Sequence, residues 1–201
     1  ITFLCIKITK NNFLFIFLNE ADRKLLSKKC NINQCNTRLI HGEGIDKEEF
    51  KYIKRSDPNA KFLLASRLVK SKGIECFLAA AKKIKKRFPL AEFSIAGIYD
   101  PDNPEAISRT LFDELRKSND IKFLGQILHS NMEECLHANN IFVLVSEREG
   151  LPKAAAEAAS TGMPLILSNV PGCEDCVINN KSGKLIPYMD CLLYTSPSPR
   201  D

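Results

Sequence analysis

Short apolar runs alternate with segments of helical periodicity along most of the chain. The apolar runs are bounded by Gly, Pro or polar residues, have the length of buried parallel strands, and cover residues 62–66, 92–96, 121–124, 141–146 and 164–168. Helical spacing occupies the intervals between them, at residues 74–88, 104–118, 131–137 and 152–161. Repeated strand–helix–strand units predict an α/β fold with a Rossmann-like, doubly wound parallel sheet. We therefore expect a ligand site beyond the carboxyl ends of the strands.

The helix expected at residues 74–88 has one strongly basic face. Lys82, Lys83, Lys85 and Lys86 lie opposite its apolar stripe, and Pro89 ends the periodic segment. Such a face is usually solvated, and we expect the same here. Contact with anionic lipid headgroups or phosphates stays open as the alternative.

The composition is that of an ordinary soluble protein. The 201 residues are 44% apolar and 26% charged, carry a net charge of +5, and can bury one core. The longest apolar stretch, at residues 13–18, is too short to cross a bilayer. We expect no nucleic-acid partner.

The cysteines indicate a compartment rather than a site. Eight of them in a chain of this length favour free thiols in a reducing environment. The expected location is therefore the cytoplasm, with peripheral contact to the inner face of the cell membrane as an option. Cys173 and Cys176 form one CxxC pair, but no second pair exists and the histidines lie far from it in the sequence. A zinc site is not expected, and no metal or other cofactor is predicted.

Both ends of the sequence suggest a piece of a longer protein. The chain begins with Ile1 rather than Met, so we expect the true start to be missing. Residues 191–201 have no apolar period and match what one reading frame of a widely used sequencing-library adapter would encode. We expect this tail to be an artefact and exclude it from the fold.

Two glutamates flank a predicted strand-to-helix turn. Glu149 and Glu157 are separated by seven residues, and Gly150, Leu151 and Pro152 lead into the helix, with Pro152 in its first turn. Eight helical steps rise about 12 Å, comparable with the reach from a transferred sugar to a ribose. Free N–H groups and the dipole at the helix start favour a phosphate. A helix-capping Glu149 and a solvated Glu157 would explain either residue alone.

A pair of cations follows the first strand of the predicted sheet. Arg67 offers a rigid fork to phosphate oxygens, and Lys72 offers a mobile point charge. Together they suit a nucleoside diphosphate as it departs. Two surface cations near a loop are the alternative, which would be preferred without the glutamate pair.

These residues resemble family 4 of the retaining glycosyltransferases, which have the two-domain GT-B architecture. The resemblance extends over about residues 15–187. Its motifs are Asn19-Glu-Ala-Asp22, Gly42-Glu-Gly-Ile-Asp46, Arg67 with Lys72, Glu149-Gly-Leu-Pro152 with Glu157, Gly162-Met-Pro164 and Pro171-Gly-Cys173. The segment at residues 100–108 is similar to that of bacterial enzymes that build lipid-linked oligosaccharides, O-antigen and capsule.

The resemblance implies a domain plan and an activity. Residues 41–190 would form the C-terminal, nucleotide-sugar-binding domain of a GT-B enzyme, and residues 1–40 a remnant of the acceptor domain with the linker. The enzyme would move a hexosyl or N-acetylhexosaminyl group from a UDP-sugar to a glycan or polyprenyl-linked acceptor, with retention and without a metal. Because the N-terminal domain is missing, we expect this fragment to bind donor but to transfer little sugar.

The resemblance also implies a role for each site residue. Three residues would be catalytic: Arg67 and Lys72 at the diphosphate and Glu149 at the donor sugar. The remaining donor-binding residues would be Glu157 at the ribose, Gly97, Leu124 and Gly125 beside the base, and Gly150, Leu151 and Pro152 at the helix start.

Two other functions stay open at the level of sequence. A nucleotide-sugar epimerase of GT-B fold would share the cations and the strand order, although the spaced pair of Glu149 and Glu157 argues against it. A non-catalytic nucleotide-binding module is suggested by Glu43 and Glu174, which put carboxylates where relatives have a small residue and an arginine.

Overall fold

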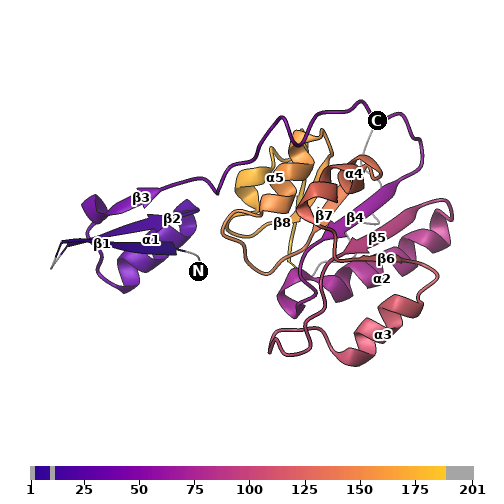
Figure 1. The fold of residues 1–201 in the computed structure, drawn as a ribbon, viewed down its shortest axis with the longest axis horizontal. Coiled ribbons are helices and arrows are strands. Elements are labelled where there is room, and N and C mark those ends of the chain that lie inside the picture. The colour runs from indigo at the N-terminus through magenta and orange to yellow at the C-terminus, as the bar shows by residue number, and fades with distance from the viewer. Residues whose placement is uncertain (1–2, 10–11, 189–201) are drawn as a thin grey trace.

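The computed structural model describes residues 3–9 and 12–188, which form a small and a larger sheet with their helices (Figure 1). The tail at residues 191–201 lies outside the described residues, so its interpretation stays a prediction. In the described part of the chain, every helix is too short or too polar to span a membrane.

The small sheet contains the N-terminal part of the chain. Its strands are β1 (Phe3–Thr9), β2 (Asn12–Phe17) and β3 (Thr37–Leu39), with β1 antiparallel and β3 parallel to β2. The helix α1 (Glu20–Lys29) connects β2 to β3. It begins after Asn19, whose side-chain oxygen accepts a hydrogen bond from the backbone N–H of Asp22 at 2.8 Å. The sequence Asn19-Glu-Ala-Asp22 is therefore a helix start.

The larger sheet has six parallel strands in the order β6-β5-β4-β7-β8-β9. They are β4 (Lys61–Ala65), β5 (Glu92–Ala96), β6 (Lys122–Gly125), β7 (Ile141–Leu144), β8 (Leu165–Ser168) and β9 (Gly183–Ile186). The chain starts in the middle at β4, winds outward through β5 and β6, and returns to β7 on the other side of β4. This is the strand order of a doubly wound Rossmann fold, so the predicted fold class is confirmed.

Helices cover both faces of the larger sheet. They are α2 (Ile74–Arg87), α3 (Arg109–Lys117), α4 (Met132–His137) and α5 (Lys153–Ser160). Successive strand residues point to opposite faces. Leu64 and Val143 accordingly pack in the core under α2 and α3, whereas Leu63 and Phe142 pack in the core under α4 and α5. Burial on both faces explains the unbroken apolar runs in the sequence.

The observed elements differ from the predicted ones mainly at their ends. The helix α3 begins at Arg109 rather than at residue 104, because the Ser108 hydroxyl caps it by accepting a hydrogen bond from the N–H of Leu111 at 3.2 Å. Pro152 is the N-cap residue of α5, so its placement in the first helical turn was wrong by one position. The strand β9 was not predicted, since Gly183 and Lys184 leave it only a short apolar run.

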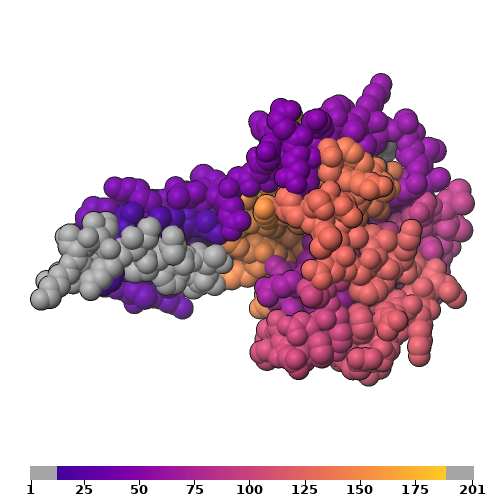
Figure 2. Space-filling view, in the orientation of Figure 1, coloured from indigo at the N-terminus to yellow at the C-terminus, as the bar shows by residue number. Residues whose placement is uncertain are grey.

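An irregular segment at residues 47–60, which begins with a turn, leads from the small sheet to β4 and lies against α4 and α5 (Figure 2). Phe50 anchors it in the core with 1% of its surface exposed. The hydroxyl of Ser160 donates to the carbonyl oxygen of Phe50 at 2.8 Å. The backbone N–H of Ile53 donates to the carbonyl oxygen of Thr161 at 3.3 Å. These contacts hold the segment against the end of α5.

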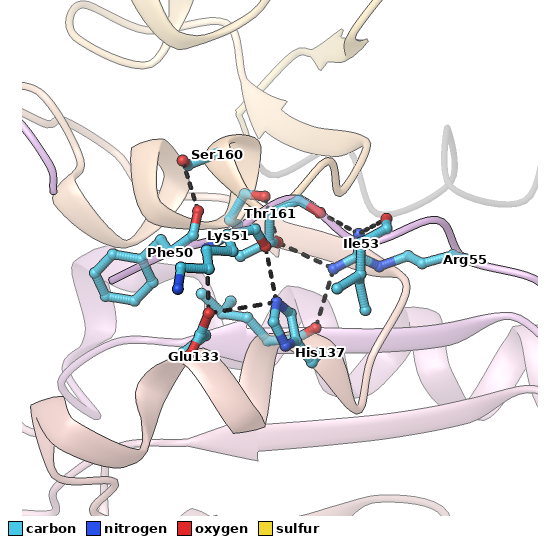
Figure 3. Close-up of polar contacts among 10 residues, drawn as sticks. Phe50, Lys51, Ile53, Arg55, Glu133, His137, Ser160 and Thr161 are labelled. Carbon is cyan, nitrogen blue, oxygen red and sulfur yellow. Dashed lines mark hydrogen bonds and ion pairs between the residues drawn. The ribbon is translucent and has the colours of Figure 1, made fainter. Parts of the chain in front are cut away.

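Arg55, from the same segment, donates hydrogen bonds to the C-terminal ends of two helices (Figure 3). At α5, its Nη1 donates to the carbonyl oxygen of Thr161 at 2.5 Å and its Nη2 to the hydroxyl at 3.0 Å. At α4, Nη2 donates to the carbonyl of Leu136 at 3.3 Å and Nε to that of Asn139 at 3.1 Å. Helix ends leave carbonyl groups without partners and carry a partial negative charge. One cation satisfies both requirements at two helices.

Replacing Arg55 by Ala is expected to lower the free energy of unfolding by about 2 kcal/mol, because charge-assisted hydrogen bonds to buried carbonyl groups are lost. Urea denaturation followed by circular dichroism measures this change. Arg109→Ala is the matched control, since Arg109 is exposed and forms a pair with Asp113 at 3.3 Å and a cation–π contact with Phe112 at 5.9 Å, and its loss should cost below about 1 kcal/mol. Equal losses in the two variants would contradict the role of Arg55 at the helix ends.

Candidate functional site

The order of the strands reverses between β4 and β7, and open α/β sheets bind ligands in the crevice at such a point. The two strands are direct neighbours and parallel, so their carboxyl ends lie at the same edge of the sheet. The loop after β4 carries Arg67 and Lys72, and the loop after β7 carries Ser146 and Glu149. The fold therefore brings together the two segments that the sequence marked as chemically informative.

Lys72 and Glu149 form an ion pair across this crevice. The Nζ of Lys72 lies 2.5 Å from Oε1 of Glu149, and the hydroxyl of Ser146 donates to the same oxygen at 2.6 Å. The two charged side chains are only 16% and 12% exposed, so water screens the pair weakly. Two donors on one oxygen hold the carboxylate in one orientation.

Close backbone contact brings the two loops together. The short helix η2 (Lys70–Lys72) ends at Gly73, whose φ of 69° lies in the left-handed region. A Cβ on Gly73 would lie 2.4 Å from the carbonyl oxygen of Val145, so only glycine fits there. The N–H of Glu147 also donates to the carbonyl of Ser71 at 2.8 Å. The backbone itself thus places Lys72 beside Glu149.

The helix α1 of the small sheet holds the Glu149 loop from another side. The side-chain Nδ2 of Asn19 donates to the carbonyl oxygen of Gly150 at 2.9 Å. One turn along α1, the fully buried carboxylate of Asp22 pairs with Nη2 of Arg148. In the sequence, Asn19 and Asp22 belong to a motif that resembles one of the family, but no role could be assigned to them from the sequence alone. Their contacts show that they position the backbone around Glu149.

The motif Pro171-Gly-Cys173 lies against the same loop. Gly172 has a φ of 84°, and a Cβ there would lie 2.5 Å from the carbonyl oxygens of both Glu149 and Gly150. Burial raises the pKa of the Cys173 thiol to about 12 and that of Cys176 to about 11, so both free thiols stay protonated at neutral pH. In residues 3–9 and 12–188, His, Cys, Asp and Glu form no group of three that could hold a metal.

A pocket of about 260 Å³ opens at the ends of β4 and β5. Gly97 lines it, and a Cβ there would lie 1.9 Å from the carbonyl oxygen of Ser66, so the wall is bare backbone. Ile127 contributes an apolar side chain to the lining. Leu124 and Gly125 precede the lining residues, and the carbonyl of Gly125 accepts a hydrogen bond from the N–H of Gly97 at 2.8 Å. The pocket is largely apolar, as a site for a planar base should be.

Arg67 stands at the border of this pocket and a second one. It is exposed, and it also lines a neighbouring pocket of about 220 Å³ together with Tyr99 and Asn103. Among the described residues, no carboxylate forms an ion pair with Arg67. Its guanidinium is therefore available to an incoming anion.

The helix α5 points its N-terminal N–H groups at the loop that carries Glu149. Pro152 precedes the helix, and no side chain caps it. Leu151 lines a pocket of about 270 Å³ that also includes Lys153 and the exposed Glu43. An uncapped helix start with a neighbouring lysine favours an anion. Glu174 is exposed as well and begins the short helix η4 (Glu174–Cys176).

Glu157 lies on α5 and is buried, with 4% of its surface exposed. The alternative of a solvated Glu157 was therefore wrong. Its Oε1 lies 3.5 Å from Nε2 of His129 and 3.9 Å from Nζ of Lys153, and Nδ1 of His129 lies 2.7 Å from Oε1 of Glu49. Burial raises the pKa of the Glu157 carboxyl, and Lys153 and His129 partly offset this. Sequence reasoning missed Glu49 and His129, because neither belongs to a motif and both lie in connecting segments.

Comparisons with known proteins identify the family of this chain. The family model described as glycosyl transferases group 1 matches residues 45–190. A glycogen synthase of Mycobacterium tuberculosis H37Rv is 30% identical over 146 residues, which cover 70% of this chain and 34% of the relative. The N,N'-diacetylbacillosaminyl-diphospho-undecaprenol alpha-1,3-N-acetylgalactosaminyltransferase of Campylobacter jejuni is 29% identical over 181 residues, which cover 84% and 46%. The chain thus spans about a third to a half of these relatives.

Solved structures support the same architecture. The sucrose-phosphate synthase of Thermosynechococcus elongatus superposes with a TM-score of 0.74 at 26% identity, covering 88% of this chain and 45% of that one. The structural neighbours are GT-B glycosyltransferases, which confirms the predicted resemblance. With a family model that covers most of its length, the chain belongs to the group 1 glycosyltransferases.

Proposed function

We propose that this chain is the donor-binding part of a retaining glycosyltransferase that moves a hexosyl or N-acetylhexosaminyl group from a UDP-sugar to a glycan or polyprenyl-linked acceptor. The observation that carries the proposal is the Lys72–Glu149 pair at the switch point, flanked by the pocket at Gly97 and by the buried Glu157. A nucleotide sugar needs separate places for its base, ribose, diphosphate and sugar. These elements supply all four at one edge of one sheet.

In this proposal Arg67 and Lys72 bind the diphosphate. The exposed guanidinium of Arg67 donates to two phosphate oxygens at once. The ammonium group of Lys72 donates one hydrogen bond to the phosphate while it stays in contact with Glu149. As the bond to the sugar breaks, negative charge grows on the departing diphosphate, and both cations stabilise it. The uncapped start of α5 adds backbone N–H groups. Because these groups neutralise the diphosphate, we propose that the reaction needs neither a metal nor another cofactor.

Glutamates hold the two sugar rings of the donor. Glu149 keeps one carboxylate oxygen on Lys72 and Ser146 and offers the other to hydroxyl groups of the transferred sugar. Glu157 accepts from the ribose hydroxyls, while the base lies against Gly97 and Ile127. Carboxylates accept hydrogen bonds only, which matches rings that present O–H donors.

The wider setting is part of the same proposal. The Campylobacter relative is named for transfer to an undecaprenol diphosphate carrier, which supports a lipid-linked acceptor. Residues 1–40 are proposed as a remnant of the acceptor domain, and residues 41–190 as the donor domain. We propose a cytoplasmic location for the enzyme, with peripheral contact to the inner face of the cell membrane as an option. The matched relatives named here are transferases or synthases, so an epimerase or a non-catalytic module is not favoured.

Calorimetric titration tests the donor site. The chain should bind UDP more tightly than GDP, and Glu157→Gln should weaken UDP binding by about 1.5–3 kcal/mol, the cost of a lost hydrogen bond to a charged group. Glu147→Gln is the control, because Glu147 is exposed in the same motif. Tighter binding of GDP, or equal losses in both variants, would argue against a UDP donor held at Glu157.

A second titration separates the diphosphate from the nucleoside. Lys72→Gln should weaken UDP binding at least about tenfold, since a charged phosphate contact is lost, and should leave uridine binding unchanged. Lys70→Gln, an exposed lysine of the same short helix, should change neither. Thermal unfolding checks that the unpaired Glu149 leaves the chain folded. A variant that loses UDP and uridine equally would show that Lys72 is not a phosphate ligand.

A further inference from the structure

His129 lies between two carboxylates from different parts of the chain. It belongs to the short helix η3 (His129–Asn131), which follows β6. Its Nδ1 faces Oε1 of Glu49 at 2.7 Å, and its Nε2 faces Oε1 of Glu157 at 3.5 Å. The imidazole is 52% exposed, whereas the Glu157 side chain is 5% exposed. The histidine therefore connects a buried carboxylate to a solvated one.

Glu49 and Phe50 hold the imidazole of His129 in place. Glu49 is fixed by its neighbour Phe50, whose ring is buried in the core and whose N–H donates to the carbonyl of Asp46 at 3.1 Å. The edge of the same ring lies against His129, with 5.6 Å between ring centroids and an interplanar angle of 78°. Packing and the short contact to Glu49 together hold the imidazole in the orientation that aims Nε2 at Glu157.

The geometry restricts where the protons sit. A neutral imidazole has one N–H, and the 2.7 Å contact places it on Nδ1, as a donor to Glu49. Nε2 would then present a lone pair to the Glu157 carboxylate, which is repulsive. Contact is favourable when the imidazole carries both protons, or when Glu157 itself holds one. The contact between His129 and Glu157 is therefore favourable only when a proton lies between Nε2 and the Glu157 carboxylate.

A ribose diol distinguishes these two forms. Its hydroxyls donate to an ionised carboxylate, whereas a protonated carboxyl has lost one acceptor oxygen and its charge. The form with a doubly protonated His129 leaves Glu157 ionised, and this form binds ribose better. Lys153, at 3.9 Å from Glu157, acts in the same direction.

We propose that His129 is a positioning residue for the donor: held by Glu49, it keeps the buried Glu157 in the ionised form that accepts the ribose hydroxyls. This inference rests on the proposed function, because it assumes that Glu157 is the ribose ligand. Glu49 and His129 line a pocket of about 520 Å³. Its other charged groups also enter any pH dependence: Glu43, Asp46, Lys47 and Lys153.

The sign of the expected pH effect follows from the contacts. Burial raises the pKa of Glu157, and His129 counteracts this. Without the imidazole, the pKa of Glu157 rises further, so that the carboxyl takes up its proton at a higher pH. UDP affinity should therefore be lost as the pH falls, and lost at higher pH in His129→Asn than in wild type.

The test measures Kd for UDP by calorimetry between pH ~8 and pH ~5.5 in wild type, His129→Asn and His137→Asn. The UDP phosphate itself titrates near pH ~6, so the result is the ratio of variant to wild-type Kd at each pH. For His129→Asn this ratio should rise toward about tenfold as the pH falls, the loss expected when the ribose hydroxyls no longer donate to a charged carboxylate. For His137→Asn it should stay constant, because His137 contacts Lys51 and Glu133 instead.

A second comparison separates the failure of this inference from failure of the donor site. With Glu157→Gln as background, His129→Asn should no longer change the pH dependence, since no carboxylate is left to protonate. A constant ratio for His129→Asn, together with weakened UDP binding by Glu157→Gln, would overturn the role of His129 only. The role of His129 would also be overturned if, in the Glu157→Gln background, adding His129→Asn still changed the Kd for UDP by a factor that depends on pH. A folded wild type that binds no UDP at any pH would overturn both proposals.

Discussion

The ion pair between Lys72 and Glu149 is the interaction on which the rest of the site depends. It joins the loops after β4 and β7, the two strands between which the sheet reverses its order. With 16% and 12% of the side chains exposed, neither charge is well solvated alone, so each requires the other when no ligand is present. In the proposed function, the diphosphate and Glu149 share Lys72. The pair therefore holds the ammonium group of Lys72 in the crevice between the two loops.

Backbone contacts set this geometry more than side chains do. Gly73 lets its loop approach the carbonyl of Val145, and Gly172 lets another segment approach the carbonyls around Glu149. The side chain of Asn19, from the small sheet, holds the same backbone from a third direction. Glycine at the two close approaches is a steric requirement, since a Cβ would overlap the neighbouring oxygen. The site is thus shaped before any donor arrives.

Much of this could be predicted from the sequence, and the remainder has identifiable reasons. The buried parallel strands are unbroken apolar runs, so their positions and the fold class followed from the pattern; the strand β9 has too few apolar residues to stand out. Arg67, Lys72 and Glu149 lie in short motifs just after strands, where open α/β sheets bind their ligands, and Glu157 follows on the next helix. The contacts of His129 with Glu49 and Glu157 join segments far apart in the chain, and no local sequence pattern indicates such contacts.

The account is tested most directly by locating UDP on the chain, in a crystal structure of the complex. We expect the uracil in the pocket at Gly97, the ribose at Glu157, and the diphosphate within hydrogen-bond distance of both Arg67 and Lys72. The Nζ of Lys72 should be shared between phosphate and Glu149. UDP bound at another surface, with the Lys72–Glu149 pair unchanged and the pocket at Gly97 empty, would contradict the account.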